Sequence, residues 1–97
     1  MTIDFEFEWD PVKAQANLHK HRVPFLMACE AFKDGSRIER PEESINYGEE
    51  RWILLGRVDQ KVLMVVFTQR EQRIRLISAR KATKDEQREY WNGLLHP

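Results

Sequence analysis

The sequence contains a single cysteine, four glycines, four prolines and no long apolar run. One cysteine excludes an intramolecular disulfide, and the lack of a disulfide framework is typical of proteins in a reducing compartment. No segment approaches the roughly 20 apolar residues that a membrane-spanning helix needs. The acidic start of the chain is unlike a signal peptide. We therefore expect a cytoplasmic protein with no membrane association.

The sequence also lacks a net charge, since 16 Lys and Arg residues balance 16 Asp and Glu residues. Proteins that bind nucleic acids are usually basic, so the overall charge argues against such a partner. The charges are unevenly distributed, however. Residues 1–10 carry four acids and no base, whereas residues 69–84 carry six Lys or Arg and a single acid. We therefore expect acidic and basic patches on different parts of one domain that spans residues 1–97.

Residue patterns that would hold a metal ion or a cofactor are missing from the sequence. His19 and His21 are two positions apart in a helical pattern, so their side chains diverge. Cys29 lies in an apolar run and is expected to be a small buried hydrophobe rather than a nucleophile. No glycine-rich phosphate loop is present. The sequence thus predicts no metal site and no cofactor.

The hydrophobic periodicity predicts an α+β fold, in which helices and strands are segregated along the chain. Helices are expected at residues 11–21, 24–34 and 84–91, and strands at residues 5–9, 37–40, 51–58, 61–68 and 73–79. Asp10 and Thr83 are expected N-caps, and Asn92-Gly93 should end the last helix. Residues 41–50 should form a polar loop. The last three strands are joined by such short links that we expect antiparallel hairpins.

The strand expected at residues 73–79 is unusual, because cations replace some of its apolar residues. Arg73 and Arg75 are two positions apart and share one face of the strand, whereas Ile74 and Leu76 share the other. Guanidinium groups held on a stiff sheet can bind phosphate oxygens in a bidentate manner. The first hypothesis is therefore an anion-binding face whose natural ligand is an RNA backbone.

Several stretches, taken in order, match the pattern of a known family. They are residues 7–11 with Lys13, Ala14 and Asn17, residues 20–23, residues 48–51, residues 65–68 with Arg70, residues 74–82, and Tyr90. Over nearly its whole length the chain resembles the BrnT family of toxins from type II toxin–antitoxin systems. The family usually has glycine where this chain has Arg22. Arg22 must either adopt a left-handed conformation or change the turn that ends the first helix.

The resemblance implies a RelE-like fold, with an antiparallel sheet, two N-terminal helices on one face of the sheet and a C-terminal helix. It implies a metal-independent endoribonuclease that cleaves RNA on the exposed side of the sheet and inhibits translation. It also implies a BrnA-type antitoxin as the partner. Such an antitoxin neutralises the toxin in a hetero-oligomer and represses the shared operon by binding operator DNA.

Metal-free RNA cleavage uses the 2′-hydroxyl as an internal nucleophile, so it needs a base, an acid and cations near the phosphate. His21 is the first candidate for proton transfer, because histidine titrates near neutral pH. Glu49 and Glu50 are adjacent and should point to opposite faces, and we favour Glu50 as the titrating carboxylate. The predicted catalytic cations are Arg70, Arg75 and Arg80.

Further RNA contacts are predicted outside this catalytic set. They are Lys20, Arg73, Lys81 and Trp52. If Trp52 shared the face of the arginines, its ring would stack on an unpaired base.

Each of these residues also has a less specific interpretation. Lys20 and His21 can complement the dipole at the end of a helix, the glutamates can be solvated loop charges, and the arginines can form ordinary salt bridges. A second functional class is a non-catalytic module that binds its antitoxin or nucleic acid and regulates transcription. A third is a protein–protein adaptor without an RNA ligand. Expression of the chain alone separates the classes, because only an active toxin arrests growth.

Overall fold

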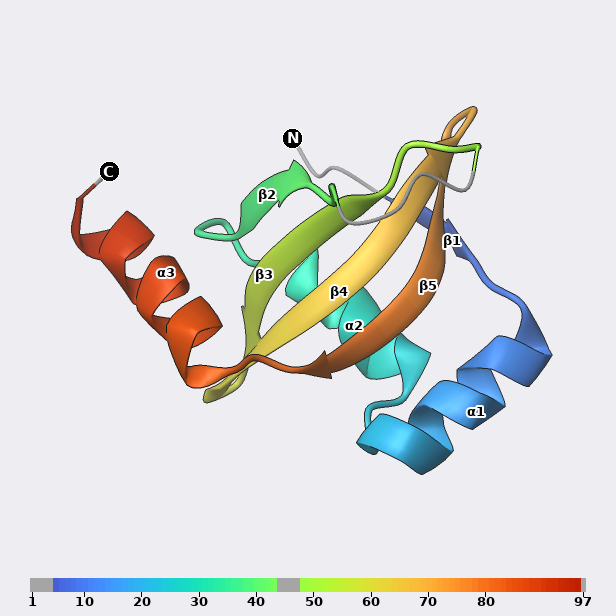
Figure 1. The fold of residues 1–97 in the computed structure, drawn as a ribbon, viewed down its shortest axis with the longest axis horizontal. Helices are drawn as coiled ribbons and strands as arrows, with labels where there is room; N and C mark the ends of the chain where they lie inside the picture. Colours follow the sequence, from blue (N-terminus) through green and yellow to red (C-terminus); the bar gives the residue numbers. More distant parts are fainter. Residues whose placement is uncertain (1–4, 44–47, 97) are drawn as a thin grey trace.

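The computed structural model describes residues 5–43 and 48–96, which form a five-stranded sheet and three helices (Figure 1). The elements are β1 (Glu6–Glu8), α1 (Pro11–His21), α2 (Phe25–Ala31), β2 (Ile38–Pro41), β3 (Trp52–Val58), β4 (Lys61–Arg70), β5 (Arg73–Lys81) and α3 (Lys84–Leu95). The predicted α+β class is confirmed. Asp4 of the acidic N-terminal stretch and residues 44–47 of the expected polar loop lie outside the described residues. Across the described ranges, no helix has the length and apolar character needed to span a membrane.

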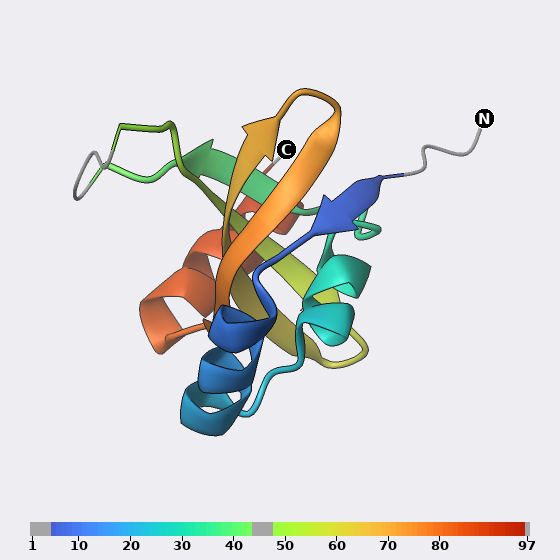
Figure 2. The same cartoon turned by 90° about the vertical axis from the view of Figure 1, so that its right-hand side faces the viewer.

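The strands follow the spatial order β1-β5-β4-β3-β2. β3, β4 and β5 form the predicted antiparallel hairpins, and β2 pairs antiparallel with β3. β1 differs, because it runs parallel to β5 at the edge of the sheet. A parallel pair needs a long crossover, and here α1, α2 and three strands separate β1 from β5. The short first strand therefore lies beside the last one (Figure 2).

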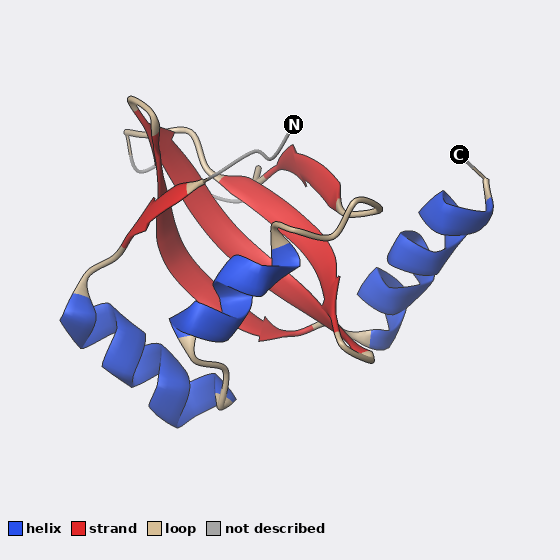
Figure 3. Cartoon of the chain, turned by 180° about the vertical axis from the view of Figure 1, so that it is seen from behind, coloured by secondary structure: helices blue, strands red, loops and turns tan. Residues whose placement is uncertain are grey.

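α1 and α2 cover one face of the sheet, as the resemblance implied (Figure 3). α2 contributes Phe25, Ala28 and Ala31 to the core, and Phe32 follows at its end. The strand residues buried on this face are Leu54, Leu63, Val65, Phe67, Ile74, Leu76 and Ala79. Most of them are two positions apart within a strand, so the alternation of side chains brings them to one side of the sheet.

α3 packs against the opposite face, away from the β4–β5 hairpin (Figure 1). Tyr90 is only 1% exposed and donates a hydrogen bond to Asp34 Oδ2 at 2.6 Å. Burial and this hydrogen bond raise the pKa of Tyr90 to about 12. Arg40 in β2 forms an ion pair with Glu89 at 2.9 Å. α3 is thus fixed at one end of this face, and no helix among residues 5–43 and 48–96 covers the end at the β4–β5 hairpin.

The start of α3 agrees with the prediction, but its predicted end is wrong. Thr83 and Glu86 form the expected capping box. The helix then continues through Asn92-Gly93 to Leu95. A Cβ atom at position 93 would lie 3.0 Å from Ile38 Cδ1. Gly93 therefore allows α3 to approach β2 closely rather than ending the helix.

α1 begins and ends at the predicted residues. Asp10 Oδ1 accepts a hydrogen bond from the Val12 N–H at 2.9 Å, and Pro11 is the first helical residue. The helix is capped by Arg22, whose φ of 61° and ψ of 26° are left-handed and whose N–H donates to the Leu18 carbonyl. Of the two outcomes expected for Arg22, the structure shows the left-handed conformation. The left-handed conformation destabilises a residue that has a Cβ atom by about 1–2 kcal/mol.

Arg22→Gly is expected to raise the melting temperature by about 4 °C, which corresponds to about 0.5–1 kcal/mol. Glycine removes the left-handed strain, but it also gives the unfolded chain more conformational entropy, so the gain is smaller than the strain. Thermal melting followed by circular dichroism measures the change. Arg22→Ala is the matched control, because it removes the same charge and keeps the strain. If Arg22→Gly melted below Arg22→Ala, the strain would not be what limits stability at this turn.

Candidate functional site

Three arginines lie on one face of the β4–β5 hairpin, and we call Arg70, Arg73 and Arg75 the arginine triad. Arg70 and Arg73 are cross-strand partners, and Arg75 follows two positions after Arg73. Ile74 and Leu76, which alternate with these arginines, are buried in the core on the other side of the sheet. The predicted division of this strand into a cationic face and an apolar face is confirmed.

β1 brings a carboxylate to the arginine triad. In the parallel register Glu8 is the partner of Arg75, and Glu6 is the partner of Arg73. Arg75 Nη1 donates a hydrogen bond to Glu8 Oε2 at 2.8 Å, and Arg73 Nη1 lies 3.7 Å from Glu8 Oε1. The hydrogen bond from Arg75 lowers the pKa of Glu8, burial opposes this, and the charges of all three arginines add to the lowering. Glu8 is therefore ionised at neutral pH.

Glu8 lies at the candidate site, although the sequence did not predict it there. The alternation of Phe5 and Phe7 with Glu6 and Glu8 places both glutamates on the polar face of β1. It does not reveal which strand β1 joins, because Glu8 and Arg75 are 67 positions apart. The sequence thus indicated that Glu6 and Glu8 lie on the polar face of a strand. It did not indicate that this strand pairs with β5.

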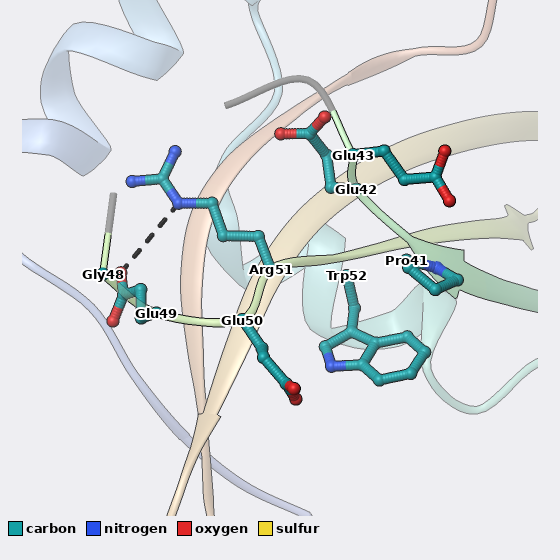
Figure 4. A pocket seen from close by; sticks show the side chains of 8 residues that line it. All are labelled: Pro41, Glu42, Glu43, Gly48, Glu49, Glu50, Arg51 and Trp52. Atoms are coloured by element: carbon teal, nitrogen blue, oxygen red, sulfur yellow. Dashed lines mark ion pairs between the residues drawn. The ribbon is translucent and has the colours of Figure 1, made fainter. Parts of the chain in front are cut away.

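The loop before β3 places one of two adjacent glutamates at the triad. Glu49 Oε2 accepts a hydrogen bond from Arg70 Nη2 at 3.1 Å, and Glu49 Oε1 lies 3.9 Å from Arg51 Nε. Figure 4 shows the side chains of Glu50 and Trp52 on the side of the chain opposite to Arg51. The two glutamates point in different directions, as predicted. The one that reaches the triad is Glu49, however, and not the favoured Glu50.

The same loop lines a cleft that is open to solvent. Two adjoining hollows of about 480 and 500 Å³ share Glu49, Glu50 and Trp52, and the second extends along β4 to Arg70. Thr68 Oγ1 donates a hydrogen bond to the Glu50 carbonyl at 2.6 Å, which holds the loop against β4. The cleft therefore opens beside Arg70, at one end of the triad.

Trp52 does not share the face of the arginine triad. It is the cross-strand partner of Phe67, and it packs against the core on the side covered by α1 and α2. The condition for stacking a base beside the arginines is therefore not met. Trp52 contributes to the wall of the cleft instead.

Arg80 and Lys81 lie at the other end of β5. The β4–β5 register skips Ile77, so Arg80 points to the same face as Arg75 although the two are an odd number of positions apart. Arg80 donates hydrogen bonds to both carboxylate oxygens of Glu86, at 2.8 and 2.9 Å. Arg80 therefore fastens α3 to the sheet, roughly 15 Å along the strand from Arg75. Lys81 is exposed at the strand end.

Lys20 and His21 are the last residues of α1, which lies away from the β4–β5 hairpin (Figure 2). Asn17 holds α1 beside the far end of β5. Its Nδ2 donates to the Ala79 carbonyl at 2.9 Å, and the Ala79 N–H donates to its Oδ1 at 3.1 Å. Within the part of the chain that the structure describes, no hydrogen bond or ion pair joins Lys20 or His21 to the triad. The structure thus separates His21 from Arg75.

The described residues contain potential metal-ligand side chains and a single thiol. No three His, Cys, Asp or Glu side chains among residues 5–43 and 48–96 are grouped as metal ligands. Cys29 is half-buried and packs against the core, and burial raises the pKa of its thiol to about 11. Because the thiolate is the reactive form, Cys29 is a poor nucleophile at neutral pH.

Most of the chain matches the model of one protein family. Residues 9–86 match the family described as the ribonuclease toxin BrnT of type II toxin–antitoxin systems. The chain belongs to the BrnT family. No curated protein matches it. Family membership makes the chain a ribonuclease toxin of a type II system, with an antitoxin as its partner. The matched residues include the whole arginine triad, and Glu8 stands immediately before them.

Proposed function

We propose that this BrnT-family toxin is a metal-independent endoribonuclease of the cytoplasm that cleaves RNA at the arginine triad and thereby inhibits translation. The observation that supports the site is the position of three guanidinium groups on the part of the sheet that no described helix covers (Figure 1). Fixed guanidinium groups can hold the scissile phosphate and stabilise the charge that develops on it. The cleft beside Arg70 offers space for a neighbouring nucleotide.

The proposed reaction is attack of the ribose 2′-oxygen on the adjacent phosphorus. A base removes the 2′-proton, the O2′–P bond forms, the P–O5′ bond breaks, and the leaving oxygen takes up a proton. In this proposal Arg70 and Arg75 bind the phosphate during this step. Proton transfer by His21 or Glu50 stays a prediction, because neither side chain contacts the triad in the free protein.

The remaining predicted RNA contacts would bind nucleotides beyond the scissile phosphate. Arg73 belongs to the triad, and Lys81 and Lys20 lie toward the far end of β5. Arg80, which was predicted as a catalytic cation, lies with them, and we propose that it too binds RNA beyond the scissile phosphate. An RNA strand that follows β5 would meet these cations in succession. Arg80 would have to keep its ion pair with Glu86 or exchange it for a phosphate.

The proposed partner is a BrnA-type antitoxin that neutralises the toxin in a hetero-oligomer. Acidic side chains of the antitoxin would meet the cations of the toxin, since complementary charge directs protein association. Repression of the operon would act on operator DNA through the antitoxin only.

A second function is favoured by a different observation. Every arginine of the triad already forms an ion pair with a carboxylate of the same chain, namely Glu49, Glu6 or Glu8. His21, the residue best suited to proton transfer, lies at the other end of β5. A non-catalytic module that binds its antitoxin and takes part in transcriptional autoregulation would need neither a free phosphate site nor a proton donor.

Induced expression of the chain alone tests the proposal. The expected result is growth arrest with degradation of total RNA, and the purified protein should cleave a synthetic RNA in the presence of EDTA. A wild-type protein that folds and accumulates but leaves growth and RNA intact would exclude the ribonuclease and favour the binding module. If EDTA abolished the cleavage, the reaction would depend on a metal ion, but the protein would still be a ribonuclease.

A further inference from the structure

Glu8 stands out among the carboxylates near the triad, because it contacts two of the three arginines. It accepts a hydrogen bond from Arg75 and lies within 3.7 Å of Arg73. Its side chain is 27% exposed, so it is held in place and still open to a ligand. Glu6, two positions earlier on the same strand, has a side chain that is 72% exposed and lies 3.5 Å from Arg73. Glu8 is thus the more buried carboxylate of the two and the one with more arginine contacts.

The contact with Arg75 leaves the guanidinium able to bind a second anion. A guanidinium group has five N–H donors, and the hydrogen bond to Glu8 uses Nη1. A phosphate oxygen bound by another N–H of Arg75 would therefore lie close to the Glu8 carboxylate. In RNA the 2′-hydroxyl is adjacent to the scissile phosphate, so the same arrangement brings that hydroxyl to Glu8.

We infer that Glu8 is the general base of the cleavage reaction, in an inference that rests on the proposed endoribonuclease function. The carboxylate takes the 2′-proton, O2′ bonds to phosphorus, and the P–O5′ bond breaks. The departing O5′ takes a proton from water, and Glu8 then returns its proton to solvent. The products are a 2′,3′-cyclic phosphate and a 5′-hydroxyl end, and no oxidant or cofactor is consumed.

The electrostatics of the site keep Glu8 in the ionised form that a base requires. The charged groups that face Glu8 are Arg75 and Arg73 from β5 and Arg70 from the end of β4. Because they lower the pKa of Glu8, the carboxylate is ionised at neutral pH and its oxygens are free of a proton, although the same charges make it a weaker base than an ordinary glutamate. The cleavage rate should fall as the pH drops through this lowered pKa, below the range of an ordinary glutamate. A neutral Glu8 can no longer take up the 2′-proton.

Glu8→Gln tests the inference, because glutamine has the same shape and cannot act as a base. Glu6→Gln is the matched control, since it removes one carboxylate from the same face of the same strand. Single-turnover cleavage of a synthetic RNA should fall about 10²-fold in Glu8→Gln. Cleavage by Glu6→Gln should stay close to that of wild type, because the Glu6 side chain is 72% exposed and pairs with Arg73 rather than with Arg75. Binding of a 2′-deoxy analogue of that RNA should be unchanged or tighter in Glu8→Gln, because Arg75 and Arg73 lose a competing anion.

The pH profile tests whether the ionisation of Glu8 controls the cleavage rate, and the binding of the 2′-deoxy analogue separates a base from a residue that only positions the arginines. Wild type and Glu6→Gln should show the acidic limb, and Glu8→Gln should lack it at pH values where circular dichroism shows a folded protein. Glu8→Asp keeps an ionisable group one methylene further back, so it should cleave faster than Glu8→Gln and keep the limb. If Glu8→Gln does not fold, the comparison of Glu8→Asp with wild type tests the inference instead.

Several results would overturn the inference while leaving the ribonuclease intact. They are a Glu8→Gln protein that cleaves like wild type, an unchanged acidic limb in that variant, a loss of activity explained by weaker binding alone, or a Glu8→Asp protein no faster than Glu8→Gln. If wild type itself does not cleave RNA, the proposed function fails. Cleavage by wild type is therefore measured before any variant is compared with it.

Discussion

Arg75→Ala is expected to lower RNA cleavage about 10²–10³-fold and to restore growth in cells that express the chain alone. Arg75 lies between Arg73 and the middle of β5, and its guanidinium is held at 2.8 Å from Glu8. A cation fixed before the substrate arrives stabilises the developing phosphorane without reorganisation. Cleavage of a labelled RNA under single-turnover conditions, together with growth curves after induction, measures both effects.

Two further variants sharpen this test. Arg88→Ala is the control, because Arg88 is an exposed residue of α3 that pairs with Asp85 within the helix. It should cleave like wild type. Arg75→Lys keeps the charge but loses the planar fork, so it should recover only part of the activity. If Arg75→Ala cleaved RNA as fast as Arg88→Ala, the triad would not be the catalytic site.

Asn17→Ala is expected to destabilise the fold by about 3 kcal/mol, lowering the melting temperature by about 12–20 °C. Asn17 is a polar residue with only 7% exposure, and its amide makes three hydrogen bonds. Two of them join both backbone groups of Ala79, so the side chain pairs with β5 much as a neighbouring strand would. Alanine would leave these buried backbone groups without partners. Urea denaturation and thermal melting measure the loss.

Gln15→Ala is the matched control, because Gln15 is an exposed residue of the same helix. Its stability should stay within about 0.5 kcal/mol of wild type. Asn17→Asp keeps the shape but cannot donate to the carbonyls of Val23 and Ala79, so it should not rescue stability. An Asn17→Ala protein within about 1 kcal/mol of wild type would contradict the structural role.

Local signals in the sequence predicted the elements that they control. Asp10 before Pro11 set the start of α1, and the capping box at Thr83 set the start of α3. The alternation of Arg73 and Arg75 with apolar neighbours gave the two faces of β5. Each of these features depends on residues a few positions apart. The residues that cause the feature are therefore visible together in the sequence.

Features that depend on distant residues could not be read from the sequence. Gly93 looked like a helix end, but it serves a close contact with Ile38 in β2. The pairing of β4 with β5 skips Ile77, and no residue type in β5 predicts this irregularity. The family resemblance supplied residue types for a site, yet it gave no distances, so it grouped His21 with Arg75 although they lie at opposite ends of β5.

The parallel pairing of β1 with β5 has a consequence for the synthesis of the toxin. The contact between Glu8 and Arg75 spans 67 positions, and the partner of Arg70 in the hairpin, Arg73, also belongs to β5. Chains emerge from the ribosome with the N-terminal part first. A nascent chain that ends before residue 73 has made Glu8 and Arg70 but holds no assembled site. Under the proposed function, a growing polypeptide therefore cannot cleave RNA at this site until the last strand has joined the first.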